Sequence, residues 1–341
     1  MTFYQFMEKF PTEQAAVEYF YNIRFGGILS CPHCGAKTAV YRYRKLKKLC
    51  TCKNCLNSFS PFKDTIFEKS ATDLRKWLYA IHLILNARKG ISAIYLQREI
   101  GVTYKTAWRM LQQIRQAMKD NELKPFESLV EVDETYVGGK PRWCPSPKGV
   151  DLSLLDDLPD ADFAIEIPEI VSPSSPVVKH GRGTKKTPVF GIKERESGKV
   201  YAQVMLPDEL KKKLTGRQLL TVIERVCKEG VTVYSDDFSS YKILDEPDFL
   251  MLLDGLEPIC RFGHKTVCHS TREYVAPGGV HTNGIESFWA LFKRGHHGTY
   301  HSMSVKYMQR YLDEFCFRQN TCKMDSIDTF DLLLKRCVLK P

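Results

Sequence analysis

The sequence lacks long hydrophobic runs. No stretch approaches the roughly 18 consecutive apolar residues that a bilayer-spanning helix requires. The first twenty residues carry Glu8, Glu13 and Glu18 and no continuous apolar segment, so a secretory signal is not expected. Charged residues make up 26% of the 341 positions, close to the average for globular proteins, which argues against low complexity or extensive disorder. We therefore expect a cytoplasmic protein of two or three domains.

Positive charge is concentrated in the first third of the chain. Residues 1–125 contain 21 lysines and arginines against 9 acidic residues, whereas the remaining 216 residues contain 29 basic and 31 acidic ones. A basic segment joined to a nearly neutral one is typical of a nucleic-acid-binding module attached to a second domain. A solvated cationic surface is the alternative, and charge alone does not decide between the two.

Four of the twelve cysteines form a pattern. In a chain without a secretion signal, many cysteines indicate reduced thiols and metal sites rather than disulfides. Two Cys-x-x-Cys pairs separated by seventeen residues place four thiolates around one tetrahedral ion. We predict a structural zinc ribbon over about residues 26–62 and expect the nearby His33 and Cys50 not to be ligands. The predicted Zn²⁺ ligands are Cys31, Cys34, Cys52 and Cys55.

The segment between the two cysteine pairs is strongly basic and interleaved with Tyr41 and Tyr43. We expect it to contact DNA phosphates. Many zinc ribbons are nevertheless purely structural, because so small a module needs its metal to fold. The basic residues are Arg42, Arg44, Lys45, Lys47 and Lys48.

From about Thr72 to Lys119 the apolar residues follow a helical period, with Thr72 or Asp73 as the expected first cap. Two further helices flank a turn at Gly101, and small Ala107 stands where they would cross. This pattern predicts a helix-turn-helix that reads DNA, with an ordinary helical hairpin as the alternative. The side chains expected to face a groove are Tyr104, Lys105, Arg109 and Gln112; those expected to be buried are Trp108, Leu111 and Ile114.

Beyond Pro125 the period changes to that of strands. Asp133 and Glu134 are neighbours on the first strand and so point to opposite faces of a sheet. Two more strands, a helix over Thr215 to Cys227 and a strand ending at Asp236 follow. This order is that of an RNase H-like sheet. The predicted fold class is therefore mixed α/β, with an RNase H-like core behind the zinc ribbon and the helix-turn-helix.

An RNase H-like site also needs an acidic residue on a helix that packs across the sheet. The segment after His281 supplies Glu286, which shares one helix face with Lys293 two turns later. We expect Asp133 to bridge two Mg²⁺ ions roughly 4 Å apart, with Asp236 and Glu286 on either side and Mn²⁺ as a substitute. Capping or surface solvation is the alternative role for each acid taken alone.

At these residues the chain resembles the IS1595 (ISXO2-like) family of DDE transposases. The resemblance covers nearly the whole chain and implies an enzyme that cuts at the terminal inverted repeats of an insertion sequence and joins the ends to target DNA. It implies double-stranded DNA as partner, a homodimer or larger assembly when two ends are held, and association with the nucleoid. Besides the paired cysteines, the matching stretches are VDETYVGG (132–139), HGRGTKKTPVFG (180–191), YSDDFSSY (234–241), HTNGIESFW (281–289) and YLDEFCFRQN (311–320).

The resemblance assigns the first two acids to Asp133 and Asp236 and leaves the third open. Glu286, followed by Lys293, fits the usual pattern, but some family members carry asparagine in this role, which here would be Asn283. A hard divalent cation prefers a carboxylate to an amide, which favours Glu286. Asn283 would then cap the helix or contact the substrate.

Further expectations concern auxiliary residues and domain boundaries. Lys293 is expected to contact a DNA phosphate and His281 to orient the substrate. An acid-rich insertion over about 142–188 departs from the family pattern and is expected on the surface. The predicted domains are an N-terminal segment with the ribbon (1–70), the helical DNA-binding region (71–125), the catalytic domain (126–320) and a C-terminal tail (321–341).

Two other functions stay open at the level of sequence. A non-catalytic DNA-binding regulator derived from a transposase would bind ends tightly without metal-dependent cleavage. A structure-specific nuclease would cut without regard to terminal sequence.

Overall fold

The structure, a computed structural model, describes most of the chain. Of the residues predicted to bind DNA, Lys45, Lys47 and Lys48 lie outside the described part, as does most of the insertion. None of the helices in the described part combines the length and apolar character needed to cross a lipid bilayer. The described residues are 1–37, 42–44 (backbone only), 49–138, 186–206, 214–247, 260–268 and 275–338.

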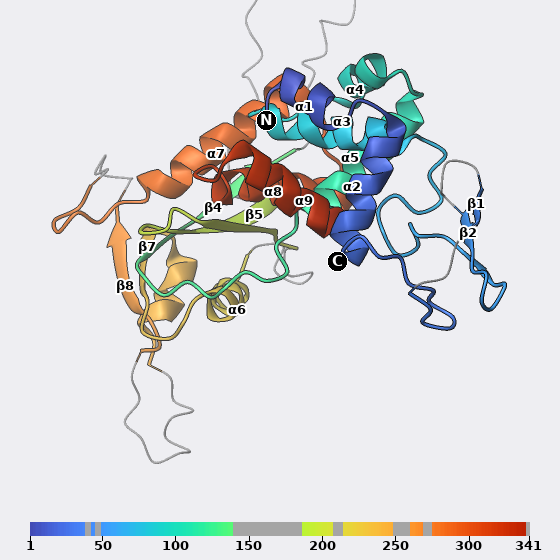
Figure 1. The fold of residues 1–341 in the computed structure, drawn as a ribbon. Coiled ribbons are helices and arrows are strands. Elements are labelled where there is room, and N and C mark those ends of the chain that lie inside the picture. Colours follow the sequence, from blue (N-terminus) through green and yellow to red (C-terminus); the bar gives the residue numbers. More distant parts are fainter. Residues whose placement is uncertain are drawn as a thin grey trace, which may run out of the picture.

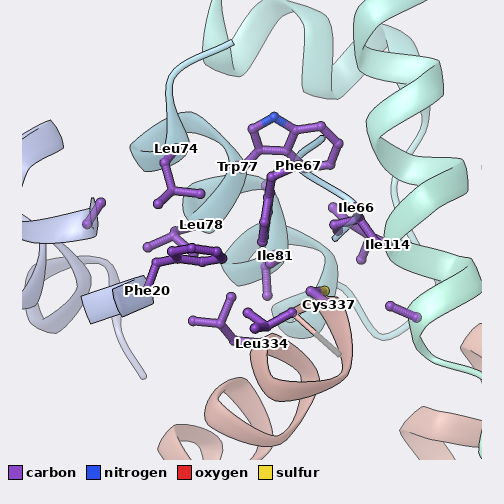
Figure 2. Close-up of a cluster of buried hydrophobic side chains, with 14 of the residues drawn as sticks. Phe20, Ile66, Phe67, Leu74, Trp77, Leu78, Ile81, Ile114, Leu334 and Cys337 are labelled. Atoms are coloured by element: carbon purple, nitrogen blue, oxygen red, sulfur yellow. The ribbon is translucent and has the colours of Figure 1, made fainter. Parts of the chain in front are cut away.

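Helices from the first third of the chain share one hydrophobic core with its last helix, α9 (Ser326–Val338). Figure 2 shows Leu334 and Cys337 of α9 among the side chains of Phe20 and Ile81. Apolar residues three and four apart give α9 its buried face. These residues therefore form a core helix, which corrects the expectation of a C-terminal tail. The other helices of this core are α1 (Phe3–Lys9), α2 (Glu13–Phe25), α3 (Leu74–Asn86), α4 (Ala93–Ile100) and α5 (Tyr104–Ala117).

Helix α3 begins where the sequence indicates, but another helix supplies its cap. Asp73 occupies the N-cap position in an extended conformation and makes no side-chain capping hydrogen bond. The Glu13 carboxylate of α2 instead accepts from the N–H groups of Leu74 and Arg75, both at 2.8 Å. A carboxylate at this place also interacts favourably with the positive end of the helix dipole. The expected local cap is thus replaced by a tertiary contact.

The predicted pair of helices and the turn between them are present in the structure, and their role in reading DNA stays a prediction. Helix α4 ends at Gly101, which takes a left-handed conformation, and Thr103 caps α5 by accepting from the N–H of Thr106. Ala107 is completely buried where the two helices meet. The small ribbon sheet of β1 (Arg42–Arg44), β2 (Leu49–Thr51) and β3 (Ser58–Phe59) stands at the end of this helical layer away from the large sheet (Figure 1).

The second half of the chain contains a five-stranded sheet. In space the strands follow the order β6-β5-β4-β7-β8. The first three in sequence pair antiparallel, whereas β7 lies parallel to β4 and β8 parallel to β7. This is the RNase H-like order that the sequence predicts. The strands are β4 (Val130–Val137), β5 (Thr187–Glu194), β6 (Val200–Val204), β7 (Thr232–Asp236) and β8 (Gly263–Val267).

Helices cover both faces of this sheet. Helix α6 (Gly216–Val226) and the 3₁₀ helix η2 (Ser239–Asp245) pack on one face; α7 (Asn283–Gly295) and α8 (Val305–Asn320) pack on the other (Figure 1). A short π-helix, η5 (His296–Tyr300), connects α7 to α8. Each helix pair therefore fills a separate core, and the residues of β4 alternate between the two.

Side-chain amides of α8 occupy the outer edge of β6. Asn320 accepts from the N–H of Val200 at 2.7 Å and donates to its carbonyl at 3.0 Å. Gln309 accepts from the N–H of Val204 at 2.9 Å and donates to the carbonyl of Ala202 at 3.1 Å. These bonds satisfy backbone groups that an edge strand otherwise offers to a further strand.

Truncating α9 at its core face tests its place in the fold. Leu334→Ala removes a completely buried side chain, so we predict a loss of roughly 2–5 kcal/mol in the free energy of unfolding, measured by urea titration followed by tryptophan fluorescence. Ile327→Ala on the exposed side of the same helix is the control and should change it by less than about 0.5 kcal/mol. Equal, small effects of the two substitutions would show that α9 does not contribute to this core.

Candidate zinc site, active site and DNA-contacting surface

The four predicted zinc ligands lie together. Their sulfur atoms are all within 4.8 Å of one another, with Cys31 Sγ 3.7 Å from Cys55 Sγ and Cys34 Sγ 3.7 Å from Cys52 Sγ. A tetrahedral zinc ion with Zn–S bonds of about 2.3 Å places its sulfurs roughly 3.8 Å apart, so the cluster fits Zn²⁺. His33 and Cys50 are not in the cluster, as expected. The geometry supports a structural zinc site.

Amide groups surround the sulfur cluster. The side chain of Asn54 donates to Cys34 Sγ at 3.7 Å, and that of Asn57 donates to Cys55 Sγ at 3.6 Å. Such outer donors spread the negative charge of thiolates and fix their orientation. The sequence signal for these contacts is an asparagine inside or just after a Cys-x-x-Cys pair, and it was not used in the prediction of the site.

The exposed face of α5 is shorter than the sequence suggests. Tyr104, Lys105 and Arg109 are exposed near its N-terminal end. Gln112 was expected to face a groove, but it is only 2% exposed and donates to the Tyr311 hydroxyl of α8 at 3.1 Å. The prediction for Gln112 is therefore wrong, because α8 covers the C-terminal half of α5.

The partner of Gln112 on α8 belongs to a stripe that the sequence places in the core. Met308, Tyr311, Leu312 and Phe315 are all buried there. Trp108 of α5, expected to be buried, is only partly so, and its ring packs edge-on against Tyr307 with centroids 5.0 Å apart.

The three predicted acids come from three different elements. Asp133 lies in the middle of β4, opposite Gly191 of β5, and Asp236 ends the parallel neighbour β7. Glu286 lies in the first turn of α7. Glu134 points to the other face, where the Tyr241 hydroxyl of η2 donates to it at 2.8 Å, as expected for neighbours on a strand.

Burial and neighbouring charge make Asp133 a weak acid. Desolvation raises its pKa well above the usual range, and the charges of Glu134, Asp236 and Glu286 raise it further. The two other candidate acids therefore lie near enough to Asp133 to repel it. Within the described ranges, only the four cysteines bring three or more ligand atoms within 4.8 Å of one another, so the three carboxylates are spaced more widely than ligands of one ion. Two ions roughly 4 Å apart are compatible with that wider spacing.

The start of α7 bears on the choice between Glu286 and Asn283. The N-cap of α7 is Thr282, and Asn283 is the exposed first helical residue, so the expectation that Asn283 caps the helix is wrong. The buried hydroxyl of Thr282 donates to Glu286 Oε1 at 3.1 Å. The charge of Glu286 also raises the pKa of Asp133. The assignment of Glu286 rather than Asn283 as the third ligand stays a prediction.

Comparison with known proteins identifies the family. The profile of the ISXO2-like transposase domain matches residues 173–320, and that of the transposase zinc-ribbon domain matches residues 11–58. A protein of the transposable element ISH50 from Halobacterium salinarum is 30% identical over 297 residues, which are 84% of each chain. The chain belongs to the ISXO2-like transposase family.

Two further similarities are shorter or weaker. A transposase-like protein of Haemophilus influenzae is 30% identical to this transposase over 108 residues, which cover 32% of this chain and 75% of that one. The crystal structure of a pre-cleavage Mos1 transpososome aligns over 76% of each chain at 12% identity, with a TM-score of 0.25.

Close packing at Gly191 sets the position of α7 in this transposase. A Cβ atom added to Gly191 would lie 2.5 Å from Trp289 Cζ2 and 3.0 Å from Ile285 Cδ1. Only glycine lets the helix lie this close to the sheet opposite Asp133. The helix also carries Lys293, which is exposed in its last turn.

The two auxiliary residues stay predictions. His281 Nδ1 lies 3.4 Å from Glu131 Oε1, so its ring packs at the start of α7. No contact in the described structure tests whether His281 orients a substrate or whether Lys293 meets a phosphate.

The zinc cluster makes a direct prediction. Elemental analysis of protein purified without added metal should give about one zinc per chain, since one set of four thiolates binds one tetrahedral ion. Cys52→Ser should lose the zinc, whereas Cys322→Ser, an exposed cysteine outside the cluster, should retain it. Full zinc content in the Cys52→Ser protein would contradict the assignment.

Removing the charge of Asp133 should stabilise the protein in magnesium-free buffer. Because its pKa is raised on folding, the folded state holds this proton more tightly than the unfolded state. The resulting stability is fully present below the ordinary carboxyl pKa and is lost as pH rises through the raised value. At about pH 8, Asp133→Asn should therefore raise the free energy of unfolding by roughly 0.5–2 kcal/mol, and the gain should shrink as pH falls.

Thermal denaturation over a pH series measures this gain. The exposed Glu122→Gln serves as control and should stay within about 0.5 kcal/mol of the unmodified protein at every pH. Destabilisation by Asp133→Asn throughout the series would mean that the Asp133 carboxylate has a favourable partner, contrary to the repulsion described above.

Proposed function

We propose that this transposase binds the terminal inverted repeats of an insertion sequence and catalyses Mg²⁺-dependent strand cleavage and strand transfer. The observation that carries the proposal is the placement of three acids on adjoining elements: Asp133 on β4, Asp236 at the end of its parallel neighbour β7, and Glu286 in the first turn of α7, which packs against β4. The charges of Asp236 and Glu286 also contribute to the raised pKa of Asp133. The three elements adjoin one another in the fold although these residues are far apart in the sequence. Like charges gathered in this way are typical of sites that bind cations.

In this proposal Asp133, Asp236 and Glu286 would hold two Mg²⁺ ions. Carboxylate oxygens are the ligands that Mg²⁺ prefers, so the donor set fits the ion. When bound, the two ions would activate the attacking water or 3′-hydroxyl and neutralise the charge on the leaving oxygen. The exposed Lys293 of α7 and Asn283 at its start would contact the DNA near the reacting phosphate.

DNA recognition is assigned to the N-terminal half of the transposase. The exposed residues of α5, Tyr104, Lys105 and Arg109, would enter a groove, as the second helix of a helix-turn-helix does. The basic segment of the zinc ribbon, with Arg42 and Arg44 on β1, would contact phosphates. Holding two ends and a target together would require a dimer or a larger assembly.

A strand-transfer assay with a labelled inverted-repeat end and a plasmid target tests this function. The unmodified protein should cut and join the end in Mg²⁺, and Asp133→Ala, Asp236→Asn and Glu286→Gln should each lower the rate by at least about 100-fold. Asp237→Asn is the matched control, because this exposed acid follows Asp236 directly. It should retain nearly full activity.

Three outcomes would contradict the proposal. Undiminished activity of Asp133→Ala would show that Asp133 is not a ligand of the catalytic Mg²⁺ ions. Tight binding of the end without metal-dependent cleavage would identify a regulator. Equal cutting of specific and scrambled ends would identify a general nuclease.

A further inference from the structure

We propose that the buried ion pair between Glu131 and Arg195 positions Glu286 by holding the start of α7, so that Glu131 and Arg195 are positioning residues of the metal site. This inference rests on the proposed function, because it takes Glu286 as a ligand of the catalytic cations.

Glu131 lies on the same face of β4 as Asp133, two residues earlier, and is 2% exposed. Arg195 Nε donates to its Oε1 at 2.7 Å, and the N–H of Ile285 donates to its Oε2 at 3.0 Å. Both carboxylate oxygens therefore have hydrogen-bond donors within the fold, and His281 Nδ1 also lies 3.4 Å from Oε1. The second bond of Glu131 holds an N–H group in the first turn of α7, where a negative charge also interacts favourably with the helix dipole.

Arg195 joins the segment before α7 to the sheet. Its Nη1 donates to the carbonyl of Gly279 at 3.1 Å and its Nη2 to the carbonyl of His281 at 2.7 Å. The guanidinium group also stacks on the ring of Tyr234 in β7, 4.8 Å from the centroid. This use of the planar, forked guanidinium is specific to arginine, because the ammonium group of lysine is a single point of charge.

The backbone at Gly284 approaches the ion pair closely. A Cβ atom added to Gly284 would lie 2.6 Å from Glu131 Oε2, and Lys193 Nζ of β5 donates to the Gly284 carbonyl at 3.1 Å. Gly284 is flanked by Thr282, which donates to the Glu286 carboxylate, and by Glu286 itself two residues later. A shift of this turn would therefore move Glu286 relative to Asp133.

Stability alone does not explain a buried ion pair. Desolvation of two charges largely offsets their attraction, so such pairs contribute little net stability compared with apolar residues. The contacts of Glu131 and Arg195 instead fix one strand, one loop and one helix start relative to one another. Metal ligands on β4, β7 and α7 can bind the same ions only if these elements keep fixed positions relative to one another, which these contacts provide.

The test measures metal binding apart from activity. Full-length protein bound to end DNA is titrated with Mn²⁺ and followed by electron paramagnetic resonance, and the Mg²⁺ concentration for half-maximal cleavage is measured in parallel. Glu131→Gln should weaken Mn²⁺ binding by about 10–100-fold, raise the Mg²⁺ requirement similarly and recover most of its rate at saturating Mg²⁺. Its affinity for end DNA should not change.

Two further variants keep the test decisive if Glu131→Gln fails to fold. Gly284→Ala retains both charges of the ion pair but displaces the Glu131 carboxylate. Arg195→Lys retains the positive charge but loses the planar set of N–H donors that the guanidinium group provides. Both should weaken Mn²⁺ binding in the same range. The matched control is Glu314→Gln, which removes an equally buried carboxylate paired with Arg115 at 2.7 Å, and it should lower the melting temperature without weakening Mn²⁺ binding.

The outcomes separate this inference from the function on which it rests. If the unmodified protein binds Mn²⁺ and cuts DNA while the Glu131, Arg195 and Gly284 variants do so at the same metal concentrations, the inference is overturned and the function stands. Equal weakening by Glu314→Gln would also overturn it, because the effect would then be general destabilisation. Absence of Mn²⁺ binding in the unmodified protein would overturn the proposed function and this inference together.

Discussion

Repulsion between the Asp133 carboxylate and its acidic neighbours is the constraint on which the half of this transposase that contains the large sheet depends. Asp133 is held where burial and neighbouring acids disfavour its charge. Helix α7, which carries Glu286, packs closely against the sheet at Gly191, the residue paired with Asp133. Under the proposed function, divalent cations bound at the site would relieve this repulsion. Each cation attracts the carboxylates that repel one another in its absence. The instability of the metal-free site and its capacity to bind metal would then have one cause.

A second buried charge cluster connects this half to α5 of the N-terminal helical layer. Arg115 of α5 pairs with Glu314 of α8 at 2.7 Å, and Arg115 and Arg318 hold the pKa of Glu314 below its usual value despite complete burial. The Arg115 guanidinium also lies 4.3 Å from the centroid of the Tyr311 ring. Because breaking one partner would leave an uncompensated buried charge, the angle between α5 and α8 is strongly specified.

The sequence predicts those features whose signal is local. Paired cysteines, an aspartate at a strand end and the apolar stripe of α7 each lie within a few residues, so the ribbon and the order of the sheet follow from them. The sequence does not reveal β8, because an edge strand with a largely exposed surface lacks apolar alternation. Tertiary contacts are likewise hidden: the cap that Glu13 provides for α3, the burial of Gln112 under α8 and the ion pair of Glu131 all join residues far apart in the chain.

Anomalous diffraction from crystals of the end-DNA complex soaked in Mn²⁺ tests the central claim most directly. The account predicts anomalous peaks beside Asp133, one shared with the Asp236 carboxylate and the other with the Glu286 carboxylate. Peaks located elsewhere, or a Mn²⁺ ion bound through Asn283 while Glu286 stays uncoordinated, would contradict it.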